Sequence, residues 1–148
     1  MKNKLDDSYD VALKEMSKQH PDIERVIGLL NESMESGHPN AAYALATWYL
    51  HGEHVEKDLS KGIMLLKRAT DKNLPEACYD LAVCYEEPAG VVEDLEKAFE
   101  LYLRAALHGD KQSFHEVGRC YYYGIGVNIN KSLADIWLEK AEELGIKE

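Results

Sequence analysis

Four residues near the carboxyl end have the residue types that phosphate-binding loops use: Gly124, Gly126, Lys131 and Ser132. A phosphate loop that joins a strand to a helix needs glycine six residues and one residue before its lysine, because backbone N–H groups must converge on the phosphates. Isoleucine and asparagine occupy those positions here. A dinucleotide fingerprint would also need a third glycine after a buried strand. The glycines therefore indicate a turn and not a phosphate site.

The histidines and cysteines match no metal-binding or nucleophilic pattern. His51 and His54 are separated by a glycine that is expected to end a helix, so they would not share a helical face as zinc ligands do. Cys78, Cys84 and Cys120 contain no CxxC pair, which favours buried, reduced thiols. We predict no catalytic residue, no metal site and no cofactor.

The charge of the chain restricts its partners. Seventeen Lys and Arg against 27 Asp and Glu give a formal net charge of −10, which repels nucleic acid and anionic lipid. A basic or weakly charged protein partner is favoured instead. The first residues, MKNKLDDSYDVALKEM, contain no apolar core of a signal peptide or membrane span. We therefore expect a cytoplasmic protein that binds neither nucleic acid nor membrane.

An internal repeat is the strongest signal in the sequence. Residues 40–75 and 76–111 match at an offset of 36, and a more diverged third copy follows from residue 112. A period of this length is typical of stacked helical hairpins. The matched residues include Tyr49/Tyr85, Asp58/Asp94, Lys61/Lys97 and Ala69/Ala105, and the third copy keeps Tyr121, Val127, Ala134, Leu138 and Ala141.

The apolar spacing within each repeat is helical. Leu81, Ala82 and Tyr85 form one stripe of a first helix, and a second, broader stripe follows the loop. Glycine in the loop accepts the left-handed backbone that ends the first helix. Asp58, Asp94 and Asn130 are expected to cap the second helix of each repeat. Each repeat is thus predicted to be a hairpin that cannot bury its apolar faces alone.

These repeats resemble the Sel-one-like repeat family, which is related to the tetratricopeptide repeats. The third copy carries the family pattern through Gly118, Tyr121, Gly124, Gly126, Val127, Ala134, Trp137, Lys140, Ala141 and Gly145. Pro88 and His54 replace loop glycines, and Leu133 replaces a lysine. The resemblance implies an all-α fold, an α-solenoid of helical hairpins in a right-handed superhelix. It also implies a scaffold or adaptor whose first helices line a concave groove.

We predict one repeat domain over residues 1–148. It consists of a diverged amino-terminal capping hairpin over 1–39 and repeats over 40–75, 76–111 and 112–148. Terminal repeats of a solenoid are expected to be atypical. A leading helix over residues 3–18 should present one apolar face, made of Leu5, Tyr9, Ala12, Leu13 and Met16.

Tetratricopeptide geometry, counted from Tyr49, Tyr85 and Tyr121, implies which residues face the groove. The expected partner-binding row combines aromatic, charged and hydrogen-bonding groups, as protein interfaces do. Arg119, Tyr122 and Tyr123 are its expected hot spot, whereas Tyr43 and Tyr79 could equally pack on neighbouring helices. The row comprises Tyr43, Thr47, Leu50, His51, Tyr79, Val83, Glu86, Glu87, His115, Arg119, Tyr122 and Tyr123.

The favoured function is a non-catalytic module that binds a protein or peptide, and a specific version is an immunity-type inhibitor of a bacterial toxin. The alternative is a hydrolase, or a small-ligand or metal-binding protein, that uses the groove histidines. Secreted cysteine-rich members of the family have been linked with β-lactams, but Thr70, Ala106 and Glu142 stand where their cysteines would be. Ile136, Trp137 and Leu138 near the end of the array could also pair with a second copy.

Overall fold

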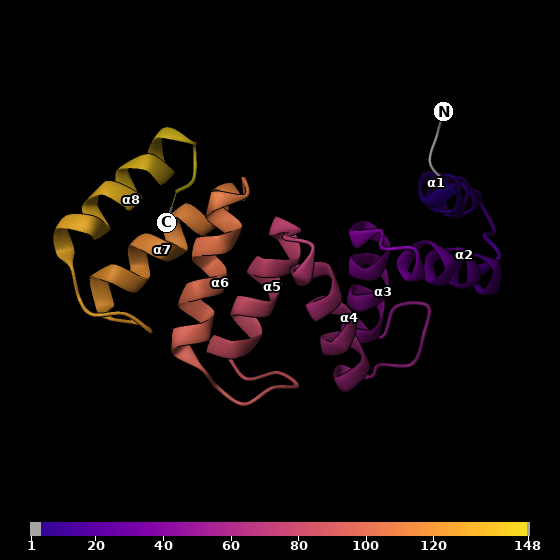
Figure 1. Cartoon of the computed structure of the whole chain (residues 1–148), viewed down its shortest axis with the longest axis horizontal. Helices are drawn as coiled ribbons and strands as arrows, with labels where there is room; N and C mark the ends of the chain where they lie inside the picture. Colours follow the sequence, from indigo (N-terminus) through magenta and orange to yellow (C-terminus); the bar gives the residue numbers. More distant parts are fainter. Residues whose placement is uncertain (1–3, 148) are drawn as a thin grey trace. The chain divides into compact units, whose positions relative to one another are not determined.

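A computed structural model describes residues 4–147, with side chains from Ser8 onwards, and these residues form α-helices joined by short loops (Figure 1). They fall into two compact units, the first ending at Lys72 and the second beginning at Asn73. The first unit contains α1 (Lys4–Met16), α2 (Ile23–Glu35), α3 (Pro39–His51) and α4 (Leu59–Asp71). The second contains α5 (Pro75–Glu86), α6 (Leu95–Leu107), α7 (Lys111–Tyr123) and α8 (Lys131–Glu143). The described residues contain no strand, and the predicted all-α solenoid of helical hairpins is confirmed.

Each predicted helix cap is present. The side chains of Asp58, Asp94 and Asn130 accept hydrogen bonds from backbone N–H groups in the first turns of α4, α6 and α8. These bonds satisfy donors that a helix start would otherwise leave unpaired. The backbone N–H of each cap also donates to the carbonyl of the repeated tyrosine, as from Asp94 to Tyr85 at 3.0 Å. The cap therefore both starts the second helix and closes the loop onto the first.

The loop glycines adopt the left-handed backbone that the sequence predicts. Gly124 and Gly126 have φ values of 73° and 68°. A Cβ at Gly126 would overlap the Leu95 carbonyl oxygen of α6, so this position needs glycine for space as well as conformation. His54 stands at the equivalent place in the first repeat and takes the same conformation, with φ of 59°. Its ring packs edge-on against Trp48, 4.7 Å between centroids, which offsets part of the strain.

The helices of each hairpin approach closely where small residues lie between them. Leu50 of α3 lies over Gly62 of α4, and Leu138 of α8 lies over Gly118 of α7. A Cβ at either glycine would come within 2.7 Å of the leucine side chain. Alanines complete these contacts, since Ala46, Ala69 and the other alanines at repeated positions are buried. The repeat thus uses small residues to bring its two backbones together.

The leading helix differs from its prediction at one position. Ala12 is buried, but Leu13 is 50% exposed. Its predicted place on the buried face is therefore wrong, because the part of α1 that packs on α2 turns away from Leu13. The buried face includes Glu15 instead, whose carboxylate binds Arg25 at 2.8 Å and accepts from the Asp22 backbone N–H. Leu5 lies outside the residues whose side chains are described.

The length and polarity of a helix determine whether it can span a membrane. None of the helices described here is long and apolar enough to cross a bilayer.

Candidate functional site

In the first unit, the predicted row lies along α3. Tyr43 is half-buried, and the Thr47 hydroxyl donates to the Ala44 carbonyl at 2.8 Å. Leu50 is half-buried over Gly62. Of the four row residues on this helix, His51 is the exposed one. Thr47 and Leu50 thus make contacts within their own hairpin.

In the second unit, the row contains a network that joins three helices. Arg119 of α7 lies 2.8 Å from the Glu86 carboxylate of α5 and 2.7 Å from Glu116 one turn earlier on α7. The hydroxyl of Tyr102, a buried residue of α6, donates to the same Glu86 oxygen at 2.8 Å. Tyr79 completes the cluster, since its ring meets Tyr102 edge-on at 5.7 Å. Glu86 and Arg119 therefore satisfy each other inside the unit.

The network shifts the ionisation of its members. Burial opposes ionisation of Glu86, but the hydrogen bonds from Arg119 and Tyr102 outweigh it and hold the pKa of Glu86 below its usual value. The hydrogen bond to Glu86 raises the pKa of Arg119. Burial, and then the bond to Glu86, raises the pKa of Tyr102. All three groups are consequently fixed in one protonation state at neutral pH, as a structural network requires.

The remaining row residues of this repeat are Val83 on α5 and Glu87, which is the C-cap of α5. Val83 is half-buried, and Glu87 is exposed at the end of the helix. Tyr79 has its pKa raised, by burial first and then by Glu116. Glu87 at the C-cap of α5 thus offers an exposed charge, whereas the charge of Glu86 is paired.

An aromatic pair is exposed at the carboxyl end of α7. Tyr122 is 40% exposed and Tyr123 is 66% exposed. Their rings meet edge-on with centroids 4.8 Å apart, and the Lys131 ammonium lies 5.2 Å over the Tyr122 ring. The neighbouring Tyr121 differs, because it packs against Phe99 of α6 at 5.2 Å. The structure therefore separates a packing tyrosine from two tyrosines that are available to a partner.

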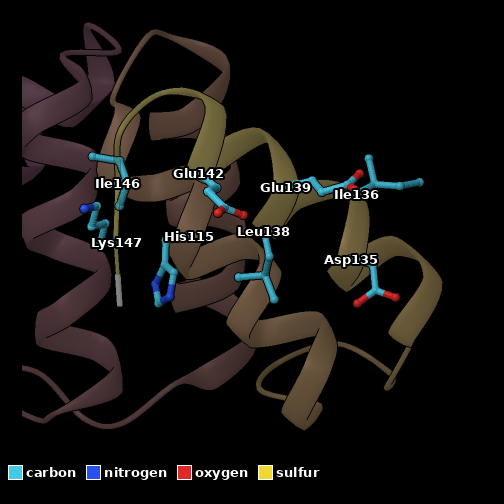
Figure 2. Close-up of a pocket in the computed structure, with 8 residues that line it drawn as sticks. All are labelled: His115, Asp135, Ile136, Leu138, Glu139, Glu142, Ile146 and Lys147. Carbon is cyan, nitrogen blue, oxygen red and sulfur yellow. The ribbon is translucent and has the colours of Figure 1, made fainter.

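His115 lies apart from the tyrosine pair, beside an open cavity of about 650 Å³. Figure 2 shows His115 between Leu138 of α8 and the carboxyl-terminal residues Ile146 and Lys147. The other residues around this cavity are Asp135, Ile136, Glu139 and Glu142. The His115 Nδ1 atom is buried without a hydrogen-bond partner among the described residues, and lies 3.8 Å from a Glu116 oxygen.

The three cysteines lie in the packed interior or at its edge. Cys78 and Cys120 are buried, Cys84 is half-buried, and none of these three side chains forms a disulfide bond. Burial raises the pKa of Cys120 to about 12, so this thiol is not a nucleophile at neutral pH. Over the described part of the chain, no three His, Cys, Asp or Glu side chains are grouped as metal ligands would be.

Comparison with protein families explains the repeat. The family model described as Sel1 repeat matches residues 39–74, 75–110 and 115–146. The chain belongs to the Sel1 repeat family. Sel1 repeats typically form protein-interaction scaffolds, and the match indicates no enzymatic family. A comparison with curated proteins found no match.

Solved structures share the Sel1 repeat fold. A protective antigen of uropathogenic Escherichia coli strains, described as having an SLR fold, is 26% identical, with a TM-score of 0.88 over 97% of this chain. A Sel1 repeat protein from Oxalobacter formigenes is 29% identical, again with a TM-score of 0.88 over 97% of this chain. An immunity protein from Pseudomonas aeruginosa, 23% identical, has a TM-score of 0.63 over 98% of this chain and 55% of its own, and shows the fold alone. This chain spans 31% and 42% of the first two proteins.

Sequence reasoning on the Sel1 repeats missed two members of the network. Tyr102 stands where the neighbouring repeats have Leu66 and Leu138. A tyrosine hydroxyl at a position that is otherwise apolar indicates that a hydrogen-bond partner lies nearby, and this signal was present in the sequence. Glu116 lies three residues before Arg119, a spacing that places both on one helical face. Neither signal identifies Glu86 as the shared partner, because only the packing of α5, α6 and α7 brings them together.

Proposed function

We propose that this chain is a protein-interaction module that binds a partner protein or peptide through the exposed tyrosines at the end of α7. The observation that carries the proposal is the pair Tyr122 and Tyr123, which is exposed and held edge-on. Tyrosine is enriched among the residues that dominate binding energy, since it offers a large apolar surface and a hydroxyl.

The surroundings of the pair support the same function. The rings restrain each other and Lys131 covers one side of Tyr122, so little side-chain freedom remains to be lost on binding. Arg119 contributes indirectly, because its ion pairs with Glu86 and Glu116 fix α7 within the second unit. Glu87 and His51 are further exposed members of the predicted row, each on its own unit.

The test is a comparison of two double variants. Tyr122→Ala/Tyr123→Ala should leave the helical circular dichroism spectrum unchanged and should lose the partner that the wild-type chain captures from native lysate. The matched control is Met64→Ala/Leu107→Ala, which removes apolar side chains of similar exposure elsewhere. The control should retain the partner. Equal capture by all three proteins would exclude the tyrosine pair as the binding site.

A finer form of the proposal is an immunity-type inhibitor that neutralises a basic toxin. The net charge of −10 supports it, because an acidic surface complements a basic enzyme and accelerates their association. The immunity protein from Pseudomonas aeruginosa has the same fold, and the likeness goes no further than the fold. If the captured partner is a basic enzyme, the chain should abolish its activity at an equimolar ratio. An enzyme that stays active in the complex would exclude inhibition and leave the adaptor role.

A further inference from the structure

The cavity beside His115 occupies a place that a helix fills one repeat earlier. At the offset of 36 residues, Asp135, Leu138 and Glu139 correspond to Phe99, Tyr102 and Leu103 of α6. In the same way, His115 corresponds to Tyr79 of α5. The cavity is therefore the third-repeat version of the surface that α5 and α6 present to α7.

In the preceding repeat that surface is covered by α7. Phe99 meets Tyr121 of α7 with ring centroids 5.2 Å apart, and α6 packs against α7. The first unit repeats the arrangement, because α3 packs on α2, where the equivalent residues Leu30 and Met34 are buried. The shape that the repeat builds at this position is thus a seat for one helix.

The side chains that line this surface are different in the third repeat. Carboxylates replace apolar residues, with Asp135 for Phe99, Glu139 for Leu103 and Glu142 for Ala106. Leu138 and Ile146 keep an apolar floor, and Ile136 is 61% exposed at the edge. A wholly apolar helix would desolvate these carboxylates without a partner, which is costly. A helix that places cations opposite them would satisfy charge and shape together.

We propose that this cavity, the acidic seat, binds a basic amphipathic helix of a partner protein. Three carboxylates and one ammonium group line it, and the lining comprises His115, Asp135, Ile136, Leu138, Glu139, Glu142, Ile146 and Lys147. The apolar side of that helix lies on Leu138 and Ile146, and its lysines or arginines face Glu139 and Glu142. A second copy of this chain is the less suitable occupant, because two chains of net charge −10 repel each other. The proposal goes beyond the function assigned to the tyrosine pair, since it adds a second surface and names the chemistry of its ligand.

The experiment uses a synthetic helical peptide as the probe. A capped peptide of about 15 residues, made of alanine with leucines at i, i+3 and i+7 and lysines flanking that stripe, should bind the full chain in fluorescence anisotropy. A peptide with glutamate in place of each lysine should not bind. Charge reversal by Glu139→Lys/Glu142→Lys should weaken binding of the basic peptide by about tenfold or more. Both glutamates are exposed on α8, so the fold should persist, and Glu139→Gln/Glu142→Gln provides a milder second variant.

The matched control separates a seat from general attraction to an acidic protein. Glu24→Lys/Glu32→Lys on α2 changes the net charge equally at exposed positions and should bind the peptide nearly as wild type does. The nitrogen resonances of the His115 ring, assigned with His115→Gln, should move on titration with the peptide. Tyr122→Ala/Tyr123→Ala should keep peptide binding, so the two proposals can fail separately.

Several results would overturn the acidic seat. Absence of peptide binding, equal weakening by the α2 and α8 variants, or binding of the acidic peptide would each remove it. Light scattering that shows a dimer lost in Glu139→Lys/Glu142→Lys would assign the seat to a second copy of the chain instead. Loss of peptide binding in the tyrosine variant alone would place the peptide on the tyrosine pair.

Discussion

A single carboxylate, that of Glu86 on α5, accepts hydrogen bonds from side chains of two other helices in the second unit. It accepts from Arg119 of α7 and from Tyr102 of α6 while it stands on α5. Its side chain is 18% exposed, so water competes only weakly for these bonds. A partly buried carboxylate with two strong donors contributes more than a surface ion pair does. We therefore expect its role to be structural, and the neighbouring Glu87 to be dispensable for folding.

The first prediction compares these adjacent glutamates. Glu86→Gln should lower the free energy of unfolding at pH 7 by about 1–3 kcal/mol, because Arg119 loses a charged partner. The exposed Glu87→Gln should change it by less than about 0.5 kcal/mol. Urea denaturation followed by circular dichroism measures both.

The pH dependence of this difference has a defined sign. The folded-state pKa of Glu86 is lowered, so its contribution is fully present above the unfolded pKa and is lost as the pH falls through the folded value. The gap between wild type and Glu86→Gln should therefore shrink below about pH 4.5. A gap that is constant from pH 7 to pH 3 would contradict the ionic role of Glu86.

Gly126 lies where a side chain would overlap neighbouring backbone atoms, which predicts the effect of a substitution. Gly126→Ala should destabilise the second unit by more than about 3 kcal/mol, because the strain of a positive φ is joined by overlap with the Leu95 carbonyl. Gly109→Ala is the matched control, since φ is also positive there and nothing lies within 4 Å of the added Cβ. Thermal unfolding should show a clearly larger loss at Gly126, and equal losses would mean that backbone strain alone matters.

At the scale of elements, the repeated cap explains why each hairpin closes in the same way. The cap side chain starts the second helix while the cap N–H holds the carbonyl of Tyr49, Tyr85 or Tyr121. In the first two repeats a lysine of the second helix also lies over the tyrosine ring, 4.5 Å for Lys61 and 5.4 Å for Lys97. Leu133 removes that cation from the third repeat, where Phe99 packs against the tyrosine instead.

The third prediction tests the cap. Asp94→Ala should lower the stability of the second unit by about 1 kcal/mol, because a first-turn N–H of α6 loses its acceptor. Glu93→Ala removes an exposed carboxylate one residue earlier and should be nearly neutral. Urea midpoints of the two variants give the comparison, and a neutral Asp94→Ala would show that water replaces the cap at no cost.

At the scale of the whole molecule, each compact unit carries one tryptophan, Trp48 in the first and Trp137 in the second. The stability of a repeat protein is the sum of repeat terms and neighbour terms, so a local change acts first where it is made. Two single-tryptophan variants, Trp137→Phe and Trp48→Phe, report on the units separately. Adding Asp94→Ala should lower the urea midpoint reported by Trp137 more than that reported by Trp48. Equal shifts would show that the whole chain unfolds as one cooperative unit.

The fold could be predicted from the sequence because short, repeated sequence patterns determine each helical hairpin. Tyr85, Asp94 and Ala98 recur at the repeat period, and each acts through neighbours within its own hairpin. Leu13 shows the limit of such patterns, since it continues the apolar stripe of α1 and is nevertheless exposed. Which side of a terminal helix is covered depends on how it packs on the next helix.

Part of the candidate site could be predicted from the sequence, and part of it depended on the tertiary structure. The resemblance to tetratricopeptide repeats, applied to the repeated tyrosines, implied a row of aromatic and charged side chains on the first helices and included Tyr122 and Tyr123 at the end of one of them. Only the packing of α5 and α6 against α7 decided that Arg119 and Glu86 neutralise each other and that the tyrosines stay exposed. The packing of α7 and α8 in the same unit placed His115 beside an acidic cavity. Periodicity in the sequence reports contacts between residues that are near each other along the chain. Ion pairs and cavities depend instead on distances between residues that are far apart in the sequence, and only the tertiary structure sets those distances.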